Sequence, residues 1–173
     1  MRKKQIQFIA EVSIFAALAL VFDFLAGLYS SFIWPNGGSI TLAFIPIFIM
    51  GYRNGLKGGL ICGLLVGTIQ LMWSSYMLNF GQVMLDYVLP NVVLGIVGLV
   101  SKQVKDANTI KLWLLVSISI FAATFLRFAS LTISGIVYWE TGFFASVIYN
   151  GGYTLISMVA SIILTPILVK RIR

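Results

Sequence analysis

Four polar groups interrupt the long apolar stretches of this chain, and their chemistry suits ligand binding better than catalysis. They are Asp23, the pair Asp86-Tyr87, Arg127 and Asn150. A carboxylate can bind a cationic ring or an amino group, and a side-chain amide can fix the orientation of a ligand. Because ionisable residues are costly in apolar segments, each of them is expected to have a partner or a function.

Two tryptophans are expected near the level of these polar groups. Trp34 lies in a turn-rich stretch (34–38), and Trp139 follows a long apolar run. They could stack on a flat aromatic ligand, or they could be ordinary aromatic residues of a membrane–water interface. The sequence leaves both interpretations open.

Arg127 is the one basic residue inside an apolar run, and we expect an acidic partner for it. Asp23 or Asp86 could neutralise it in a buried ion pair, because an intramembrane arginine needs a counter-charge more than a ligand does. Two acids are available to one arginine, so one carboxylate would remain free to face a ligand.

The chemistry that the chain lacks argues against an enzyme. It contains no histidine, no G-x-x-x-x-G-K-[ST] loop, no HExxH motif and no carboxylate pair at metal-ligand spacing. We therefore expect neither catalysis nor a metal or other cofactor in this chain. If the protein moves a substrate uphill, a partner or an ion gradient must supply the energy.

The elements that hold these residues are expected to be membrane-spanning helices. The 173 residues are 60% hydrophobic and 10% charged, with a mean hydropathy of +1.00, whereas a soluble domain carries about 25% charged residues. The length allows one domain (1–173) with about six spans. We expect an all-α, compact six-helix bundle with helices over 6–29, 40–52, 55–75, 81–101, 111–138 and 143–169. Pro46 and Pro90 are expected to interrupt the second and fourth helices.

Basic residues alternate between the connections and predict the orientation. They follow the second and fourth apolar runs and occupy both termini. At the termini they are Arg2, Lys3, Lys4, Lys170, Arg171 and Arg173, and in the two connections they are Arg53, Lys57, Lys102, Lys105 and Lys111. The connections after the first, third and fifth runs carry none. The positive-inside rule therefore predicts a multi-pass cell-membrane protein with both termini in the cytoplasm. This orientation on an anionic leaflet explains the net charge of +7, so no nucleic-acid partner is expected.

Small residues mark two places for close helix contact. Gly59 and Gly63, four apart, would let a neighbouring backbone approach closely. Ser13 and Ala17 form a similar pair on the first helix. That pair could pack inside the bundle, or it could form a docking face for another membrane subunit.

Six motifs occur in a characteristic order along the chain. They are Glu11-Val-Ser-Ile-Phe-Ala-Ala-Leu-Ala-Leu-Val-Phe-Asp23, Ile45-Pro-Ile-Phe48, Arg53-Asn-Gly-Leu-Lys-Gly-Gly59, Gln82-Val-Met-Leu-Asp-Tyr87, Ser134-Gly135 with Tyr138-Trp139, and Tyr149-Asn-Gly-Gly-Tyr153. In this order they resemble the thiamine-specific substrate-binding subunits of energy-coupling factor transporters. The resemblance spans nearly the whole chain.

The resemblance implies a bacterial six-helix subunit that captures a vitamin outside the cell. A separate module would energise it, and that module comprises a transmembrane coupling protein and two ATPase subunits that use ATP. The resemblance implies that the vitamin site contains Trp34, Asp86, Tyr87, Trp139 and Asn150. It also implies that Ser13 and Ala17 contact the coupling protein.

Three departures from the family pattern bear on the substrate. Leu131, expected to line the site, stands where the family has a histidine, and Ala145 replaces a tyrosine. The segment between Trp139 and Asn150 is also shorter. Each lost contact weakens binding by roughly 1–3 kcal/mol if a ligand group is left unpaired. The expected ligand is thiamine, with hydroxymethylpyrimidine or a vitamin B6 form as alternatives; a stand-alone carrier or channel is an alternative of another class.

Overall fold

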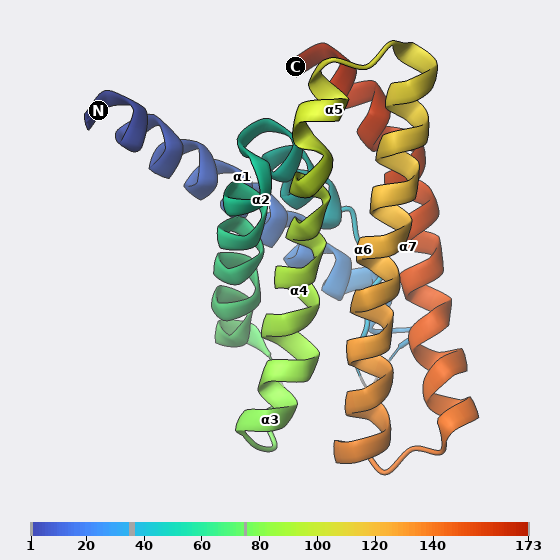
Figure 1. Cartoon of the computed structure of the whole chain (residues 1–173). Helices are drawn as coiled ribbons and strands as arrows, with labels where there is room; N and C mark the ends of the chain where they lie inside the picture. The colour runs from blue at the N-terminus through green and yellow to red at the C-terminus, as the bar shows by residue number, and fades with distance from the viewer. Residues whose placement is uncertain (1, 35–36, 75, 173) are drawn as a thin grey trace.

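The computed structural model describes residues 2–34, 37–74 and 76–172, and its regular elements are all helices (Figure 1). The long helices are α1 (Arg2–Ser30), α2 (Phe44–Ile69), α6 (Thr109–Tyr138) and α7 (Phe143–Ile172). Shorter segments follow α2, namely η1 (Gln70–Trp73), α3 (Phe80–Val83), η2 (Met84–Val88), α4 (Leu89–Leu94), η3 (Gly95–Val100) and α5 (Ser101–Lys105). Pro35 and Asn36 of the predicted turn and Arg173 of the basic tail lie outside the described residues.

The described part of the chain contains five helical stretches long and apolar enough to cross a membrane. They are Arg2–Ser30, Phe44–Trp73, Phe80–Lys105, Thr109–Tyr138 and Phe143–Arg171. The all-α prediction is confirmed, and the helices expected over 111–138 and 143–169 begin and end within a few residues of the observed bounds. The expected second and third helices correspond to the two parts of α2, which are separated by a non-helical residue at Gly55.

Gly55 divides α2 into two arms that fold back on each other. Its backbone has φ 72° and ψ −169°, a conformation that glycine adopts at little cost because it has no Cβ. A Cβ at Gly58 would lie 3.1 Å from the carbonyl oxygen of Met50, although residues eight apart in a straight helix are separated by about 12 Å. The first arm, 44–54, is buried from Phe44 to Tyr52 and forms the centre of the molecule.

The two prolines that were expected to interrupt helices, Pro46 and Pro90, act differently from one another. Pro46 lies in the first turn of α2, where its missing N–H leaves no intrahelical bond unmade, so the predicted interruption there is wrong. Pro90 does alter its helix, because it cannot donate to the carbonyl of Asp86. The preceding turn, η2, is π-helical, and the N–H of Leu89 donates to the carbonyl of Met84, five residues back.

Glycines allow α2 to pack directly against the backbone of α4 and η3. A Cβ at Gly59 would lie 2.4 Å from the carbonyl oxygen of Gly95, and one at Gly63 would lie 2.2 Å from that of Asn91. The predicted close approach at Gly59 and Gly63 is therefore confirmed. This contact holds the segment that carries Asp86 firmly against the centre of the bundle.

Replacing Gly95 by alanine is expected to lower the free energy of unfolding by about 3 kcal/mol. The added methyl group would lie 2.3 Å from the backbone of Gly59, and backbone cannot move aside as a flexible side chain can. Denaturant titration in detergent measures the effect. Gly27→Ala is the matched control, because nothing lies within 4 Å of a Cβ at that helical position. Equal stability of the two variants would contradict the close packing.

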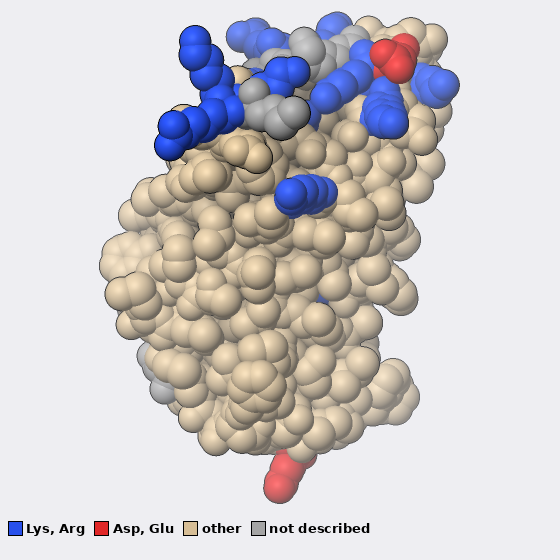
Figure 2. Space-filling model, turned by 60° about the vertical axis from the view of Figure 1, so that its left-hand side comes forward, with Lys and Arg blue, Asp and Glu red and all other residues tan. Residues whose placement is uncertain are grey.

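Charge is distributed unevenly along the molecule. Both termini lie at the same end of the bundle (Figure 1), and the lysine and arginine side chains gather over that end (Figure 2). The surface between this end and the opposite one is almost entirely uncharged in this view. This is the pattern that the positive-inside rule produces in a helical membrane protein.

Candidate ligand-binding site

The π-helical turn η2 places Asp86 and Tyr87 against α6. The widened turn frees backbone carbonyl groups from the regular ladder. One of them, on Leu85, accepts a hydrogen bond of 2.8 Å from the hydroxyl of Ser130 in α6. The carbonyl oxygen of Tyr87 accepts a bond of 2.8 Å from the side-chain amide of Asn91, one turn further along the same helical stretch. The bond from Ser130 ties the turn to α6.

The carboxylate of Asp86 is held by two donors that bind the same oxygen. Gln82 donates from Nε2 to Oδ2 at 2.6 Å, and Trp139 donates from Nε1 to Oδ2 at 2.9 Å. Gln82 is fully buried, and its own carbonyl oxygen accepts a bond from the backbone N–H of Leu78. Neither bond to Asp86 uses Oδ1, and a carboxylate oxygen of this kind can accept a charge-assisted hydrogen bond.

Tyr76 and Tyr87 extend this wall of the site. The ring of Tyr76 meets that of Trp139 edge to face, with centroids 5.6 Å apart. The hydroxyl of Tyr87 donates to the carbonyl oxygen of Tyr76 at 2.9 Å. The predicted residues Asp86, Tyr87 and Trp139 are therefore brought together, and Tyr76 joins them.

A second group of predicted residues lies where the segment after α1 meets α7. The ring of Trp34 packs edge to face on Tyr153, with centroids 6.0 Å apart. The hydroxyl of Tyr153 donates to Oδ1 of Asn150 at 2.6 Å. The amide of Asn150 donates in turn to the carbonyl oxygens of Ser146 and Leu131, at 3.0 and 3.4 Å. Asn150 thereby fixes the Tyr153 hydroxyl, and Leu131 contributes its carbonyl to the same network.

Gly37 and Gly38 lie against the tyrosines of α7. A Cβ at Gly38 would lie 2.5 Å from the Tyr153 ring, so only glycine fits there, and its φ is +94°. The hydroxyl of Tyr149 donates to the carbonyl oxygen of Gly37. Tyr149 and Tyr153, two residues of the motif on α7, therefore hold Gly37 and Gly38 in place.

Arg127 contacts an amide and an aromatic ring. Its Nη1 donates to Oδ1 of Asn91 at 3.2 Å, and its guanidinium carbon lies 4.8 Å from the centroid of the Phe44 ring. These contacts partly offset the cost of placing the charge inside the bundle. Its Nε is buried and has no hydrogen-bond partner among the described residues.

The predicted direct ion pair of Arg127 with Asp23 or Asp86 is not formed. Across the described ranges the direct ion pair joins Arg53 to Glu11, at 2.8 Å. The two acids lie beside tryptophans instead, Asp23 next to Trp73 and Asp86 hydrogen-bonded to Trp139. Both acids still interact with Arg127 electrostatically at longer range, so the arginine is balanced without a contact pair.

Ser13 and Ala17 lie on an exposed face of α1. Their neighbours Val12 and Ala16 are the residues that pack into the bundle, with exposed fractions of 3% each. Because both side chains are exposed, the pair does not pack inside the bundle, and the docking face for another membrane subunit stays a prediction.

Sequence reasoning missed three residues of the site: Gln82, Tyr153 and Tyr76. Gln82 lies four residues before Asp86, and Tyr153 lies three residues after Asn150, so helical spacing could have indicated both. No sequence signal connects Tyr76 with Trp139, because the two are far apart in the chain and meet only in the tertiary structure.

Fold and site together define a helical, multi-pass membrane protein with a carboxylate and aromatic rings gathered inside one end of its bundle. A family model described as "Thiamine transporter protein" matches residues 9–173, and the chain belongs to this family. The resemblance indicated by the motifs is therefore confirmed, and so is the prediction that the protein is a cell-membrane transporter component and not an enzyme.

Individual relatives agree with this assignment. The chain is 34% identical to the thiamine transporter ThiT of Bacillus subtilis (strain 168), over 96% of this chain and 90% of the relative. It is 28% identical to the thiamine transporter ThiT of Lacticaseibacillus paracasei, over 95% and 88%. The solved structure of ThiT from Listeria monocytogenes superposes with a TM-score of 0.80 at 26% identity, covering 97% of this chain and 96% of that one.

Proposed function

We propose that this chain is the substrate-capture subunit of an energy-coupling factor transporter and that its ligand is thiamine. The observation that carries the proposal is the Asp86 carboxylate, which Gln82 and Trp139 hold through one oxygen while leaving the other unused. Thiamine combines a permanently cationic thiazolium ring with an aminopyrimidine ring. A carboxylate beside an indole matches both features, through charge and through stacking.

Each predicted residue has a distinct role in this proposal. Trp34 and Trp139 stack on the ligand rings, and Asp86 selects the cationic or amino-bearing group. Asn150 acts through Tyr153, whose hydroxyl it orients at 2.6 Å. Leu131, buried at 7% exposure, supplies an apolar wall in place of the family's imidazole.

We also propose six membrane crossings with both termini in the cytoplasm. The two arms of α2, which fold back at Gly55, would count as the second and third crossings. The first arm has 11 residues (44–54) and is only about 16 Å long, so it relies on the preceding segment to complete its passage. The basic residues at the end that carries both termini support this orientation (Figure 2).

Transport in this proposal requires partners. A transmembrane coupling protein would dock on the face of α1 that carries Ser13 and Ala17, and two ATPase subunits would hydrolyse ATP. This chain itself would hold no cofactor. ATP-independent uptake by the purified chain alone in vesicles would contradict this arrangement and favour a stand-alone carrier.

Titrating the intrinsic tryptophan fluorescence of the detergent-purified chain tests the ligand. Thiamine is expected to quench the emission strongly at low concentration, because Trp34 and Trp139 would both contact its rings. Hydroxymethylpyrimidine and pyridoxine, each offering one ring without the thiazolium charge, are expected to bind more weakly. Tight quenching by either of these with no response to thiamine would overturn the substrate assignment.

A further inference from the structure

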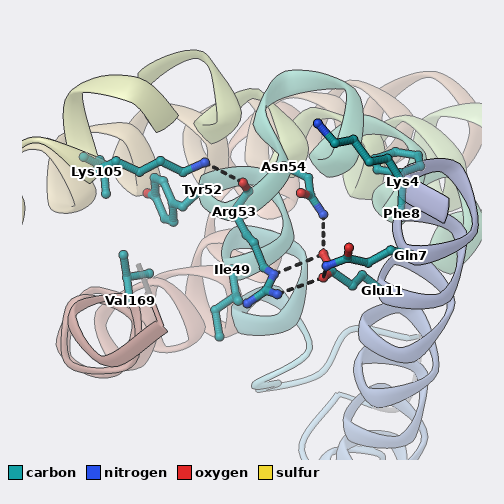
Figure 3. A pocket seen from close by; sticks show the side chains of 11 residues that line it. Lys4, Gln7, Phe8, Glu11, Ile49, Tyr52, Arg53, Asn54, Lys105 and Val169 are labelled. Atoms are coloured by element: carbon teal, nitrogen blue, oxygen red, sulfur yellow. Dashed lines mark hydrogen bonds and ion pairs between the residues drawn. The ribbon is translucent and has the colours of Figure 1, made fainter. Parts of the chain in front are cut away.

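A groove of about 600 Å³ opens at the end of the bundle where the basic residues gather (Figure 3). It lies between the first turns of α1, the end of the first arm of α2, α5 and the last turns of α7. Lys4, Arg53 and Lys105 line it together with the apolar side chains of Phe8, Ile49 and Val169. The groove therefore combines cationic groups with an apolar wall.

The one carboxylate in the groove is already fully occupied. Glu11 accepts two bonds from Arg53, at 3.0 and 2.8 Å, one from Asn54 at 2.7 Å and one from Gln7 at 3.0 Å. The two bonds from Arg53, drawn in Figure 3, form an ion pair in which the charges of Arg53 and Glu11 neutralise each other. The charge of Lys4 and Lys105 is left over, so the groove is net positive.

The two lysines can both contribute donors to an anion. Lys105 donates to the carbonyl oxygen of Arg53 at 2.8 Å, and its ammonium group has three protons, so two remain. Lys4 forms no ion pair with another described residue. Lys57 adds a third positive charge nearby, with its Nζ 5.9 Å from the centroid of the Phe8 ring.

We propose that this groove binds an anionic phospholipid of the surrounding leaflet. The phosphate would meet Lys4 and Lys105, and an acyl chain would lie along Phe8 and Ile49. Two observations favour a lipid over a soluble anion: the apolar wall, which a free phosphate cannot use, and the position at the charged end of membrane-spanning helices. Basic pockets between such helices are where anionic headgroups bind.

The bound lipid would brace α1 against the rest of the bundle. In the described structure the Glu11 network with Arg53 and Asn54 already joins α1 to α2 at this end. A lipid seated beside that network would add contacts from α1 to α5 and α7. It would thereby hold the exposed Ser13 and Ala17 face at a constant angle. This inference depends on the membrane location of the protein and not on the identity of its vitamin ligand.

Thermal unfolding of the full chain with added lipids tests the proposal. In neutral detergent with phosphatidylcholine, adding phosphatidylglycerol is expected to raise Tm by on the order of 5 °C. Phosphatidylcholine alone and inorganic phosphate at equal concentration are expected to leave Tm unchanged. Native mass spectrometry should show retained phosphatidylglycerol.

A matched pair of charge reversals locates the site. Lys4→Glu is expected to remove most of the shift in Tm, whereas Lys3→Glu, which changes the net charge equally but does not line the groove, is expected to retain it. Lys105→Gln provides a second variant from a different helix, and it should also weaken lipid retention. Equal lipid responses of the Lys4 and Lys3 variants would overturn the proposal. An equal response to inorganic phosphate would overturn it as well.

Discussion

Replacing Asp86 by alanine is expected to abolish tight thiamine binding while leaving the bundle folded. Removing one partner of a buried, hydrogen-bonded charge pair costs about 2–5 kcal/mol, which corresponds to affinity weaker by about 30-fold to several thousand-fold. The truncation also leaves the Trp139 N–H and the Gln82 amide without their shared acceptor. Fluorescence titration measures the affinity, and thermal unfolding of the same sample checks the fold.

Two further substitutions separate charge from geometry. Asp86→Asn keeps an acceptor for Trp139 but removes the negative charge, so it should weaken thiamine binding more than binding of an uncharged pyrimidine. Asp106→Ala is the control, because Asp106 follows α5 at the basic end of the bundle, away from the site. Normal thiamine affinity in Asp86→Ala would contradict the proposed role of this carboxylate in ligand binding.

Placing tryptophan at Ser13 or Ala17 is expected to abolish uptake of thiamine in cells or proteoliposomes that contain the coupling protein and the ATPases. Both positions are exposed on α1, and a bulky ring would prevent the close helix contact that small residues allow. Thiamine affinity of the isolated subunit should be unchanged, because neither residue packs into the bundle. The comparison therefore needs both uptake and equilibrium binding.

Leu18→Trp is the matched control for this experiment. Leu18 is adjacent to Ala17 in sequence and is 41% exposed, but it points about 100° further around the helix. Its replacement adds a ring on α1 without covering the Ser13 and Ala17 face, so uptake should persist. Equal loss of uptake in all three variants would indicate a general defect of α1, and lost binding in the Ala17 variant would indicate packing inside the bundle.

Most of the architecture followed from local properties of the chain. Apolar runs of sufficient length predicted helices, and for α6 and α7 the predicted bounds lie close to the observed ones. The break predicted between residues 52 and 55 coincides with Gly55, whose backbone is non-helical. Pro46 was misjudged because its effect depends on where the helix begins, which hydropathy does not specify.

The site was predicted less completely than the fold. Asp86, Trp139 and Asn150 were identified from their positions relative to the apolar runs and from the family motifs, but their partners depend on how the helices are rotated against each other. Arg127 illustrates the difference, since charge alone predicted an acidic partner. The packing instead gives it the amide of Asn91 and the ring of Phe44, both from other helical segments.

The sequence by itself determined the class of this protein, its charge asymmetry and its family, because hydropathy, charge order and motif order are properties along the chain. The tertiary structure alone decided which oxygen of Asp86 stays available, how Arg127 is balanced and where the basic groove lies. These features arise from contacts between residues distant in sequence, such as Asp86 with Trp139 and Glu11 with Arg53. Such contacts depend on the register and rotation of packed helices, which no local pattern specifies.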